Sequence, residues 1–328
     1  MSAAKSTHAI DIVIPVFAGE KTLENLMREI ATLRNHSPTP GGNQFTVDRV
    51  FLVHDCGPDR SDEVIRKICG ELDWVHPIWL TRNYGQHAAT FAGIAATGSD
   101  WVVTLDEDGQ FNPADVPEML DTAMSSQSAL VYGLPLNRPP HSPVRNALTA
   151  LNKRVVAPLL IGHTFATFSS FRLILGEVAR SASAYAGHGS YLDVVLSWIT
   201  DRKSAVRVRY RSEGRPRSGY SAWKLFAHFW RMVLTGGTRP LRIVTVIGIL
   251  SSTCGIGLAA AVVGRKFVYG YPAGFASVFV AILVFFGVLL IALGILAEYI
   301  GSISRTVMGR PLYSTRSDPE AGPFRYRS

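Results

Sequence analysis

The sequence predicts an α/β domain with a mostly parallel sheet, followed by a pair of long apolar helices. In the first half of the chain, short apolar runs alternate with helix-like segments, the order expected of a parallel sheet with helices on both faces. Beyond residue 240, two long stretches carry no charged residue. The 328-residue chain has a formal net charge of +8, and its three cysteines lack disulfide or metal-site spacing, as expected in a reducing compartment.

Strands and helices are assigned from the spacing of apolar residues. The runs 10–15, 47–54, 75–81, 101–105 and 130–132 are expected to be strands, and 20–34, 62–72 and 85–96 to be helices. Leu23, Leu26 and Ile30, for example, recur at helical spacing on one face. The carboxyl ends of parallel strands share one edge of the sheet, where ligands bind. The polar segments expected at that edge are Pro15–Phe17, Asp55, Arg82–Asn83 and Asp106–Gln110.

The fourth expected strand is followed by a cluster of oxygen-bearing side chains. Asp106, Asp108 and Gln110 are spaced two apart, so their side chains point the same way if the chain stays extended. Gly109 permits a bend, and Pro113 prevents the strand from continuing. Carboxylate and amide oxygens suit Mg²⁺ or Mn²⁺, which bind a few carboxylates together with substrate phosphate. The motif therefore predicts a divalent-metal site, and an acidic surface turn is the alternative.

The two uncharged stretches are Ile243–Val263 and Ala273–Ala297. At a rise of ~1.5 Å per residue, each is long enough to cross a hydrocarbon layer ~30 Å thick, and a pair of buried core helices is the alternative. The short connection Tyr269–Pro272 predicts a membrane hairpin with both chain ends on one side. The arginines that favour the cytoplasm for both ends are Arg231, Arg239, Arg242, Arg305, Arg310 and Arg316.

The predicted organisation has four parts. They are a cytoplasmic domain over 1–221, an amphipathic juxtamembrane helix over 222–241, a two-span hairpin over 242–300 and a cytoplasmic tail over 301–328. Aromatic residues within 222–234 suit the bilayer interface, and a packing helix between domain and hairpin is the alternative. We assign the basic charge to an anionic membrane surface rather than to nucleic acid, because no nucleic-acid-binding motif accompanies it.

Several segments together carry a resemblance to a known family. They are Ile14-Pro-Val-Phe17, Arg82-Asn-Tyr-Gly-Gln-His-Ala88, Asp106-Glu-Asp-Gly-Gln110, Pro240-Leu-Arg242 and Leu296-Ala-Glu-Tyr-Ile-Gly301. In these segments the chain resembles the family 2 glycosyltransferases with the GT-A fold. It is most similar to the polyprenyl-phosphate sugar transferases, including the undecaprenyl-phosphate aminoarabinose transferases and the dolichol-phosphate mannose synthases. The resemblance covers about residues 10–313.

The resemblance implies an enzyme of the cytoplasmic membrane, with two spans and its catalytic domain facing the cytoplasm. The implied reaction is metal-dependent, inverting transfer of a sugar from a nucleotide-sugar to polyprenyl phosphate, for modification of cell-envelope glycan or lipid. The donor is expected to be UDP-linked, although guanine, the identity of the sugar and the prenol length stay open. A homotetramer is also implied. Mg²⁺ or Mn²⁺ is implied to bind Asp106, Asp108 and Gln110, and the nucleotide-sugar to bind Pro15, Phe17, Glu20, Asp55, Arg82 and Asp106.

The acceptor phosphate is expected to be ionised, because the second pKa of a phosphate monoester is near ~6, so no strong general base is needed. Arginine suits the binding of such a group, being planar, charged and bidentate. Arg145 joins Asp106 and Asp108 as a catalytic residue, whereas Arg209 and Arg211 fit attraction to the membrane surface equally well. The acceptor-phosphate residues implied are Arg138, Arg145, Arg172, Arg215, Arg217, Ser218 and Tyr220.

Departures from the family pattern keep two other functions open. His54-Asp55-Cys56-Gly57 stands where the family usually has Asp-Asp-Gly-Ser, and Ser169-Ser170 stands where some members carry Asp. One alternative is transfer of the sugar to another membrane lipid, such as a glycerolipid, and the other is an inactive membrane scaffold. His54 is expected to be a strand-end histidine with its hydrogen bonds satisfied. Asp193 is expected to cap local structure rather than face the site, and Phe17 fits either a base contact or the core.

Overall fold

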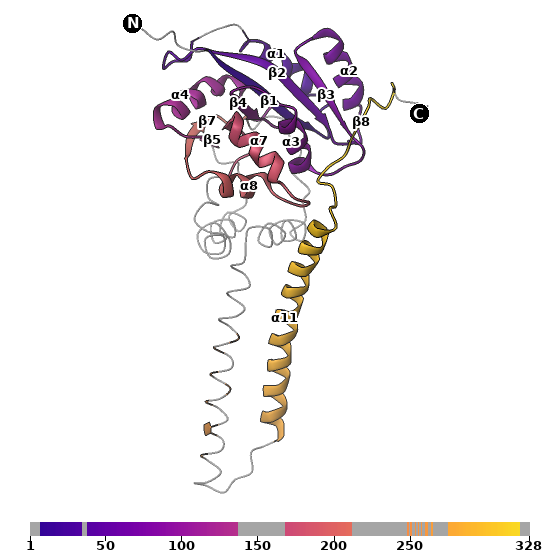
Figure 1. Cartoon of the computed structure of the whole chain (residues 1–328), viewed down its shortest axis with the longest axis vertical. Helices are drawn as coiled ribbons and strands as arrows, with labels where there is room; N and C mark the ends of the chain where they lie inside the picture. Colours follow the sequence, from indigo (N-terminus) through magenta and orange to yellow (C-terminus); the bar gives the residue numbers. More distant parts are fainter. Residues whose placement is uncertain are drawn as a thin grey trace. The chain divides into compact units, whose positions relative to one another are not determined.

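A mixed sheet of eight strands forms the frame of the N-terminal part of the chain (Figure 1). The computed structural model describes residues 7–34, 38–136, 168–211 and 275–321, with isolated positions between 248 and 264. Within these residues the strand order is β7-β5-β6-β4-β1-β2-β3-β8. Strands β1 to β4 run parallel, whereas β6 and β8 run antiparallel to their neighbours. The predicted α/β class with a mostly parallel sheet is confirmed.

The five strands and three helices expected over residues 10–132 are all present, with bounds that differ by a few residues from those expected. The strands are β1 (His8–Val16), β2 (Phe45–His54), β3 (Val75–Leu80), β4 (Trp101–Thr104), β5 (Leu130–Pro135), β6 (Arg172–Leu175), β7 (Lys203–Val208) and β8 (Thr315–Arg316). The helices are α1 (Leu23–Ala31), α2 (Ser61–Glu71), α3 (Gln86–Ala95), α4 (Val116–Ser126), α7 (Gly176–Tyr185), α8 (Leu192–Ile199) and α11 (Phe275–Val307), with a 3₁₀ turn at Pro113–Asp115.

Alternate strand residues face two different helical layers. Ile12 and Ile14 of β1 pack in a core shared with α1, α2 and α4, whereas Val13 between them packs in a core shared with α3, α7 and α8. All three side chains are fully buried, the pattern of a central strand in a sheet covered on both faces. On α3, a Cβ added to Gly93 would lie 2.3 Å from Val13 Cγ1, so glycine allows α3 to pack closely on β1.

One edge of the sheet gathers the segments that concern function. The parallel strands β1 to β4 all end there. Because β6 is antiparallel to β4, its first residue, Arg172, pairs with Thr104 at the end of β4 and lies at the same edge. Five residues separate the end of β3 from the start of α3, so the N-terminus of α3 also belongs to this edge. Chain segments far apart in sequence therefore meet around the end of β4.

The C-terminal segment returns to the sheet as an added edge strand. β8 pairs antiparallel with β3, and the backbone N–H of Thr81 donates to the carbonyl of Ser314 at 2.9 Å. Arg66 of α2 holds the following residues through an ion pair with Asp318 at 3.0 Å. By its contacts the chain divides into two units, residues 1–153, 163–219 and 311–328 in one, and 154–162 and 220–310 in the other. The described residues 311–321 thus belong with the sheet.

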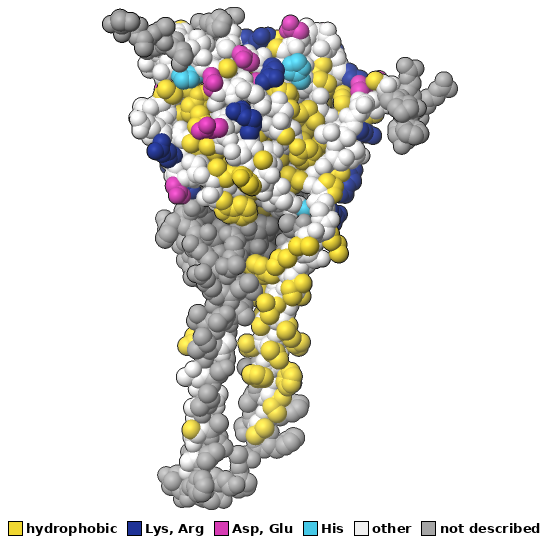
Figure 2. All heavy atoms as spheres, in the orientation of Figure 1, with side chains coloured by type: hydrophobic (Ala, Val, Ile, Leu, Met, Phe, Trp, Pro, Cys, Tyr) yellow, Lys and Arg dark blue, Asp and Glu magenta, His cyan; other side chains and the backbone are white. Residues whose placement is uncertain are grey.

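The helix α11 covers most of the second uncharged stretch and has 33 residues. Figure 2 shows hydrophobic side chains along it, and Phe285, Leu290 and Ile291 are each at least 60% exposed. Among the residues that the structure describes, no helix is identified as long and apolar enough to span a membrane. The predicted hairpin therefore stays a prediction. Most of 243–263 and all of 222–241 lie outside the described residues.

Candidate active site

Asp106 lies just beyond the end of β4, and its carboxylate is held from two sides. Gln86 at the start of α3 donates its amide N–H to Asp106 Oδ1 at 2.5 Å. The hydroxyl of Ser170, in the segment before β6, donates to Asp106 Oδ2. Two neutral donors therefore orient the carboxylate.

The rest of the acidic motif does not continue as an extended strand. The chain turns at 107–108, Asp108 Oδ1 accepts from the Gln110 backbone N–H at 3.1 Å, and Gly109 has a φ of 65°. The carbonyl oxygen of the Gln110 side chain accepts from the Tyr210 hydroxyl. A shared direction of the three side chains was expected on the assumption that the chain stays extended. The chain instead makes a turn here, which Gly109 makes possible. Their roles as metal ligands stay predictions.

Glu107 connects the acidic motif to the segment that follows β1. Its carboxylate accepts from the backbone N–H of Phe17 at 2.6 Å and of Ala18 at 3.0 Å. Burial raises the pKa of Glu107, against the lowering effect of these two hydrogen bonds. Glu107 therefore fixes the end of β4 to the segment that follows β1. Together with Asp55, described next, it gives the edge of the sheet its shape.

Asp55 has the same function between β2 and α3. Its two oxygens accept from the backbone N–H of Tyr84 at 2.7 Å and of Gly85 at 2.8 Å, and the residue is 3% exposed. Burial raises the pKa of Asp55, and the two backbone hydrogen bonds oppose that rise. The carboxylate thus orients the loop that begins α3. A contact between Asp55 and a base stays a prediction.

The other residues expected at the nucleotide lie around this loop in different settings. The Arg82 guanidinium stacks over the Tyr84 ring at 4.4 Å. Phe17 is 42% exposed, so the core alternative for this residue is wrong. Pro15 is buried within β1 opposite Val53, and Glu20 is exposed, its carboxylate accepting from the Arg60 backbone N–H at 3.4 Å. Of these residues, Phe17, Glu20 and Arg82 are exposed, whereas Pro15 is buried.

His54 is buried at the end of β2, with its ring 5.3 Å from that of Trp79 in an edge-to-face arrangement. Neither ring nitrogen has a hydrogen-bond partner among the described residues, so the expectation of a satisfied strand-end histidine is wrong. Burial lowers the pKa of His54, and nearby charges have smaller effects in both directions, since two carboxylates raise the pKa and two arginines lower it. His54 therefore packs as a neutral aromatic ring.

A buried ion pair connects β6 and α8. Arg172 donates Nε and Nη2 to the two oxygens of Asp193, each at 2.7 Å, and both residues are at most 7% exposed. Arg172 also donates to Thr104 Oγ1 at 3.2 Å, and the Tyr132 hydroxyl donates to Asp193 at 3.1 Å. Asp193 makes no helix cap, so that expectation is wrong. The contact of Arg172 with an acceptor phosphate stays a prediction, but its charge is already matched by Asp193.

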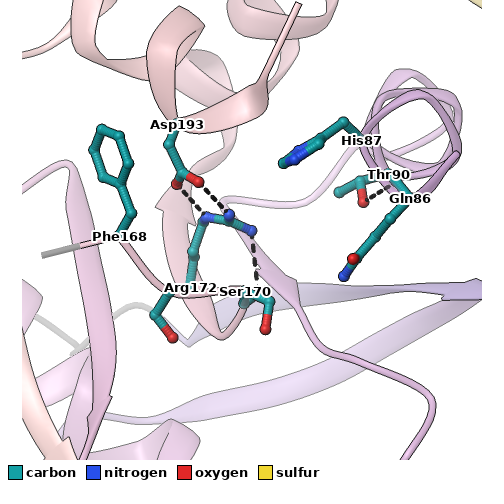
Figure 3. A pocket seen from close by; sticks show the side chains of 8 residues that line it. Gln86, His87, Thr90, Phe168, Ser170, Arg172 and Asp193 are labelled. Carbon is teal, nitrogen blue, oxygen red and sulfur yellow. Dashed lines mark hydrogen bonds and ion pairs between the residues drawn. The ribbon is translucent and has the colours of Figure 1, made fainter. Parts of the chain in front are cut away.

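A cavity of ≈190 Å³ opens beside this ion pair (Figure 3). Its walls come from the start of α3, from the segment before β6 and from the Arg172–Asp193 pair. The residues that line it are Gln86, His87, Thr90, Phe168, Ser169, Ser170, Arg172 and Asp193. Two of them, Gln86 and Ser170, are the residues that hold Asp106, so the cavity adjoins the acidic motif.

The segment after β7 packs on the acidic motif. The Arg211 backbone N–H donates to the Gln110 carbonyl at 2.9 Å, and the Arg211 guanidinium forms an ion pair with Glu29 at 2.8 Å. Arg211 is thus bound within the domain. The remaining acceptor-phosphate residues lie outside the described residues, namely Arg138, Arg145, Arg215, Arg217, Ser218 and Tyr220.

The described residues contain no group of three or more His, Cys, Asp or Glu side chains placed to hold a metal ion. Mg²⁺ usually takes one or two protein carboxylates and completes its shell with water and substrate phosphate. Asp106 and Asp108 therefore suffice in number for such an ion. The polar residues whose roles the sequence did not indicate are Gln86, Glu107, Ser170 and Tyr210. Gln86 and Glu107 lie within recognised motifs, Ser170 stands where some family members carry Asp, and Tyr210 carries no local signal.

Comparison with known proteins gives consistent results. Residues 11–170 match the family model of Glycosyl transferase family 2. A prophage-derived bactoprenol glucosyl transferase of Shigella flexneri is 26% identical over 323 residues, covering 96% of this chain and 99% of the relative. An undecaprenyl-phosphate 4-deoxy-4-formamido-L-arabinose transferase of Edwardsiella ictaluri is 26% identical over 321 residues, covering 95% of each chain.

Solved structures show the same fold. Glucosyl-3-phosphoglycerate synthase from Mycobacterium tuberculosis, solved with Mn²⁺, UDP-glucose and phosphoglyceric acid, superposes with a TM-score of 0.50. The match covers 71% of this chain and 79% of that one at 18% identity. At this level of identity the likeness concerns the fold of the sheet and its helices.

Proposed function

This chain belongs to glycosyl transferase family 2 through its domain at residues 11–170, and from that premise we propose that it transfers a sugar from a UDP-linked donor to polyprenyl phosphate. The product, a polyprenyl-phosphate sugar, serves modification of cell-envelope glycan or lipid. The named activities of two relatives that align over nearly the whole chain support this acceptor. The observation that carries the proposal is Asp106, oriented by Gln86 and Ser170 beside a cavity at the carboxyl edge of the sheet.

The donor site is the part of the edge formed by the carboxyl ends of β1, β2, β3 and β4. Asp55 and Glu107 hold the surrounding loops by accepting backbone N–H groups, so the site is shaped before the donor arrives. Arg82 and Phe17 are exposed beside Asp55 and contact the nucleotide. Asp106 and Asp108, with Gln110, would hold Mg²⁺ or Mn²⁺, which when bound neutralises charge on the departing diphosphate.

The acceptor requires positive charge rather than a base. Its phosphate is largely ionised at cytoplasmic pH, so an oxygen of that phosphate attacks the sugar without help from a strong base. Attack opposite the leaving diphosphate inverts the anomeric carbon. Arg138, Arg145, Arg215 and Arg217 cancel the repulsion between the two phosphate-bearing substrates.

We place the protein at the cytoplasmic face of the membrane, where the lipid acceptor lies. The exposed apolar side chains of α11 support this location, as does the formal net charge of +8, which favours an anionic surface. In the proposed arrangement, 243–263 and 273–297 form a two-span hairpin and the chain assembles as a homotetramer. Cross-linking in native membranes tests the oligomer, and labelling of cysteines placed at 270 and at 320 from either side of the membrane tests the topology.

The reaction is tested with membranes that contain the full chain. They are incubated with UDP- and GDP-linked sugars and with either polyprenyl phosphate or diacylglycerol, and the lipid products are identified by mass. The proposal predicts a polyprenyl-phosphate sugar that depends on a divalent cation. A glycosylated diacylglycerol would favour the other lipid acceptor, and the absence of transfer from every donor would favour the scaffold alternative.

A further inference from the structure

The cavity beside Asp106 has almost no net charge in its wall. The positive charge of Arg172 is matched by Asp193 through two hydrogen bonds of 2.7 Å. Arg172 Nη1 also donates to the Ser170 carbonyl oxygen at 3.1 Å. Beyond Gln86 and Ser170 lies the carboxylate of Asp106, which adds negative charge to the neighbourhood. A phosphate in this cavity would meet that charge, whereas a neutral ligand with hydroxyl groups would not.

The size of the cavity excludes a nucleotide. It measures ≈190 Å³, below the ~300–1,000 Å³ of pockets that enclose drug-sized ligands. Of the parts of a nucleotide-sugar donor, a single sugar ring is the one small enough for this volume. The remainder of the donor then extends past Asp106 toward the loops held by Asp55 and Glu107.

The wall offers both donors and acceptors from α3. The Leu192 backbone N–H donates to His87 Nδ1 at 3.4 Å, an assignment that puts the ring hydrogen on Nε2. Thr90 donates its hydroxyl hydrogen to the Gln86 carbonyl at 2.8 Å, so its oxygen acts toward a ligand as an acceptor. In Figure 3 the His87 ring extends from α3 toward the Arg172–Asp193 pair.

We propose that this cavity receives the transferred sugar of the donor as an uncharged ring, and that His87 and Thr90 determine which pattern of hydroxyl groups it accepts. This inference rests on the proposed function, because it assumes a nucleotide-sugar donor. The ion pair Arg172–Asp193 is the rigid floor of the cavity, and Asp106 stands where the ring joins the diphosphate.

The experiment compares donors that differ in their sugar alone. Full-length protein in membranes is given UDP-glucose, UDP-galactose, UDP-N-acetylglucosamine and a UDP-pentose, and kcat/KM is measured for each with polyprenyl phosphate. The variants are His87→Gln, His87→Ala and Thr90→Val, with His76→Gln on β3 as the matched control. Binding of UDP, which lacks the ring, is measured for the same proteins by calorimetry.

We expect the ratio of kcat/KM between the best and second-best donors to change by about tenfold in His87→Ala and Thr90→Val, the size of one hydrogen bond. The dissociation constant of UDP should change less than about twofold, and His87→Gln should restore part of the ratio. Thr90→Val keeps the side-chain shape, so it carries the test if His87→Ala does not fold.

Two results would overturn the inference while leaving the proposed function intact. One is that the variants change kcat/KM by the same factor for all donors and weaken UDP binding equally, or that they change neither quantity. Either outcome would mean that the cavity does not contact the sugar. The other is an unchanged donor ratio with a raised KM for polyprenyl phosphate, which would place the acceptor in the cavity. If the wild-type protein transfers sugar from no donor, the proposed function itself has failed.

Discussion

Replacing Asp193 by alanine is expected to destabilise the domain strongly, because it leaves the Arg172 guanidinium buried without its counter-charge. Arg172 is 5% exposed and Asp193 7%, so solvent stabilises the guanidinium charge far less than the lost carboxylate did. Thr104 and Ser170 still accept from Arg172, but both are neutral. Burial lowers the pKa of Arg172, whereas Asp193, with smaller contributions from Tyr132 and Asp106, raises it, and the net direction is upward.

The expected loss follows from the burial of the pair. Removing one member of a buried ion pair costs about 3–5 kcal/mol of unfolding free energy. The Tyr132 hydroxyl also loses an acceptor, and that loss of about 1–3 kcal/mol overlaps with the first because both involve the same carboxylate. For a domain of this size, 1 kcal/mol shifts the melting temperature by about 2–4 °C, so a decrease of about 6–20 °C is expected.

Thermal unfolding of the full-length protein in detergent, followed by tryptophan fluorescence, measures the effect. The double variant Arg172→Met/Asp193→Leu should recover most of the loss, because apolar residues of similar volume often replace a buried ion pair at little cost. Lys67→Ala, which breaks an exposed ion pair with Glu24, is the control and should leave the midpoint unchanged. A decrease below about 2 °C for Asp193→Ala, or a double variant as unstable as the single one, would refute the reasoning.

Three further predictions concern the acidic motif, the buried histidine and the C-terminal segment. Asp108→Asn should lower cation-dependent sugar transfer by about 10²-fold or more in the membrane assay. The control Asp73→Asn, on a surface turn, should leave transfer unchanged, and an Asp108→Asn variant as active as the wild type would exclude Asp108 from the metal site. The pKa of His54 is lowered from 6.5, so the folded state binds fewer protons than the unfolded state and loses stability as the pH falls through 6.5. His54→Phe should therefore raise the melting temperature and reduce the fall in melting temperature between pH 7.5 and 5.5. An unchanged dependence of the melting temperature on pH would contradict this prediction. Arg66→Met should increase proteolysis of the C-terminal segment by releasing Asp318 and Glu320, and an unchanged cleavage rate would count against that attachment.

The parallel part of the sheet was predictable because its strands are buried on both faces and read as apolar runs. The β1 segment has seven consecutive buried residues, and β2 ends in a run of five. In contrast, β6 has four residues and begins with the charged Arg172, and β8 has two exposed residues. Neither has a length or a period from which a strand could be recognised, and their place in the sheet depends on partners far away in sequence.

The candidate site likewise contains some residues that the sequence predicts and others that it does not. Asp55, Asp106 and Asp108 were predictable as polar residues that follow buried strands. Their partners were not, because the contacts of Ser170 with Asp106 and of Tyr210 with Gln110 join residues 64 and 100 positions apart. The interpretation of Asp193 was wrong for a similar reason. A carboxylate in the first turn of a helix is typical of capping, and only the buried Arg172 on another element directs it elsewhere.

The arrangement of charge around Asp106 separates the two chemical parts of the proposed donor. On the side of β1 and β2, backbone groups and exposed side chains surround a region open to solvent, where a charged diphosphate and a cation are tolerated. On the side of β6 and α8, Arg172 is the one cation among the described residues of the cavity wall, and Asp193 matches its charge, so this part of the wall is polar but neutral. In the proposed reaction, a sugar would enter there with hydrogen bonds and little electrostatic cost, and Asp106, held by Gln86 and Ser170, would lie at the bond that is broken.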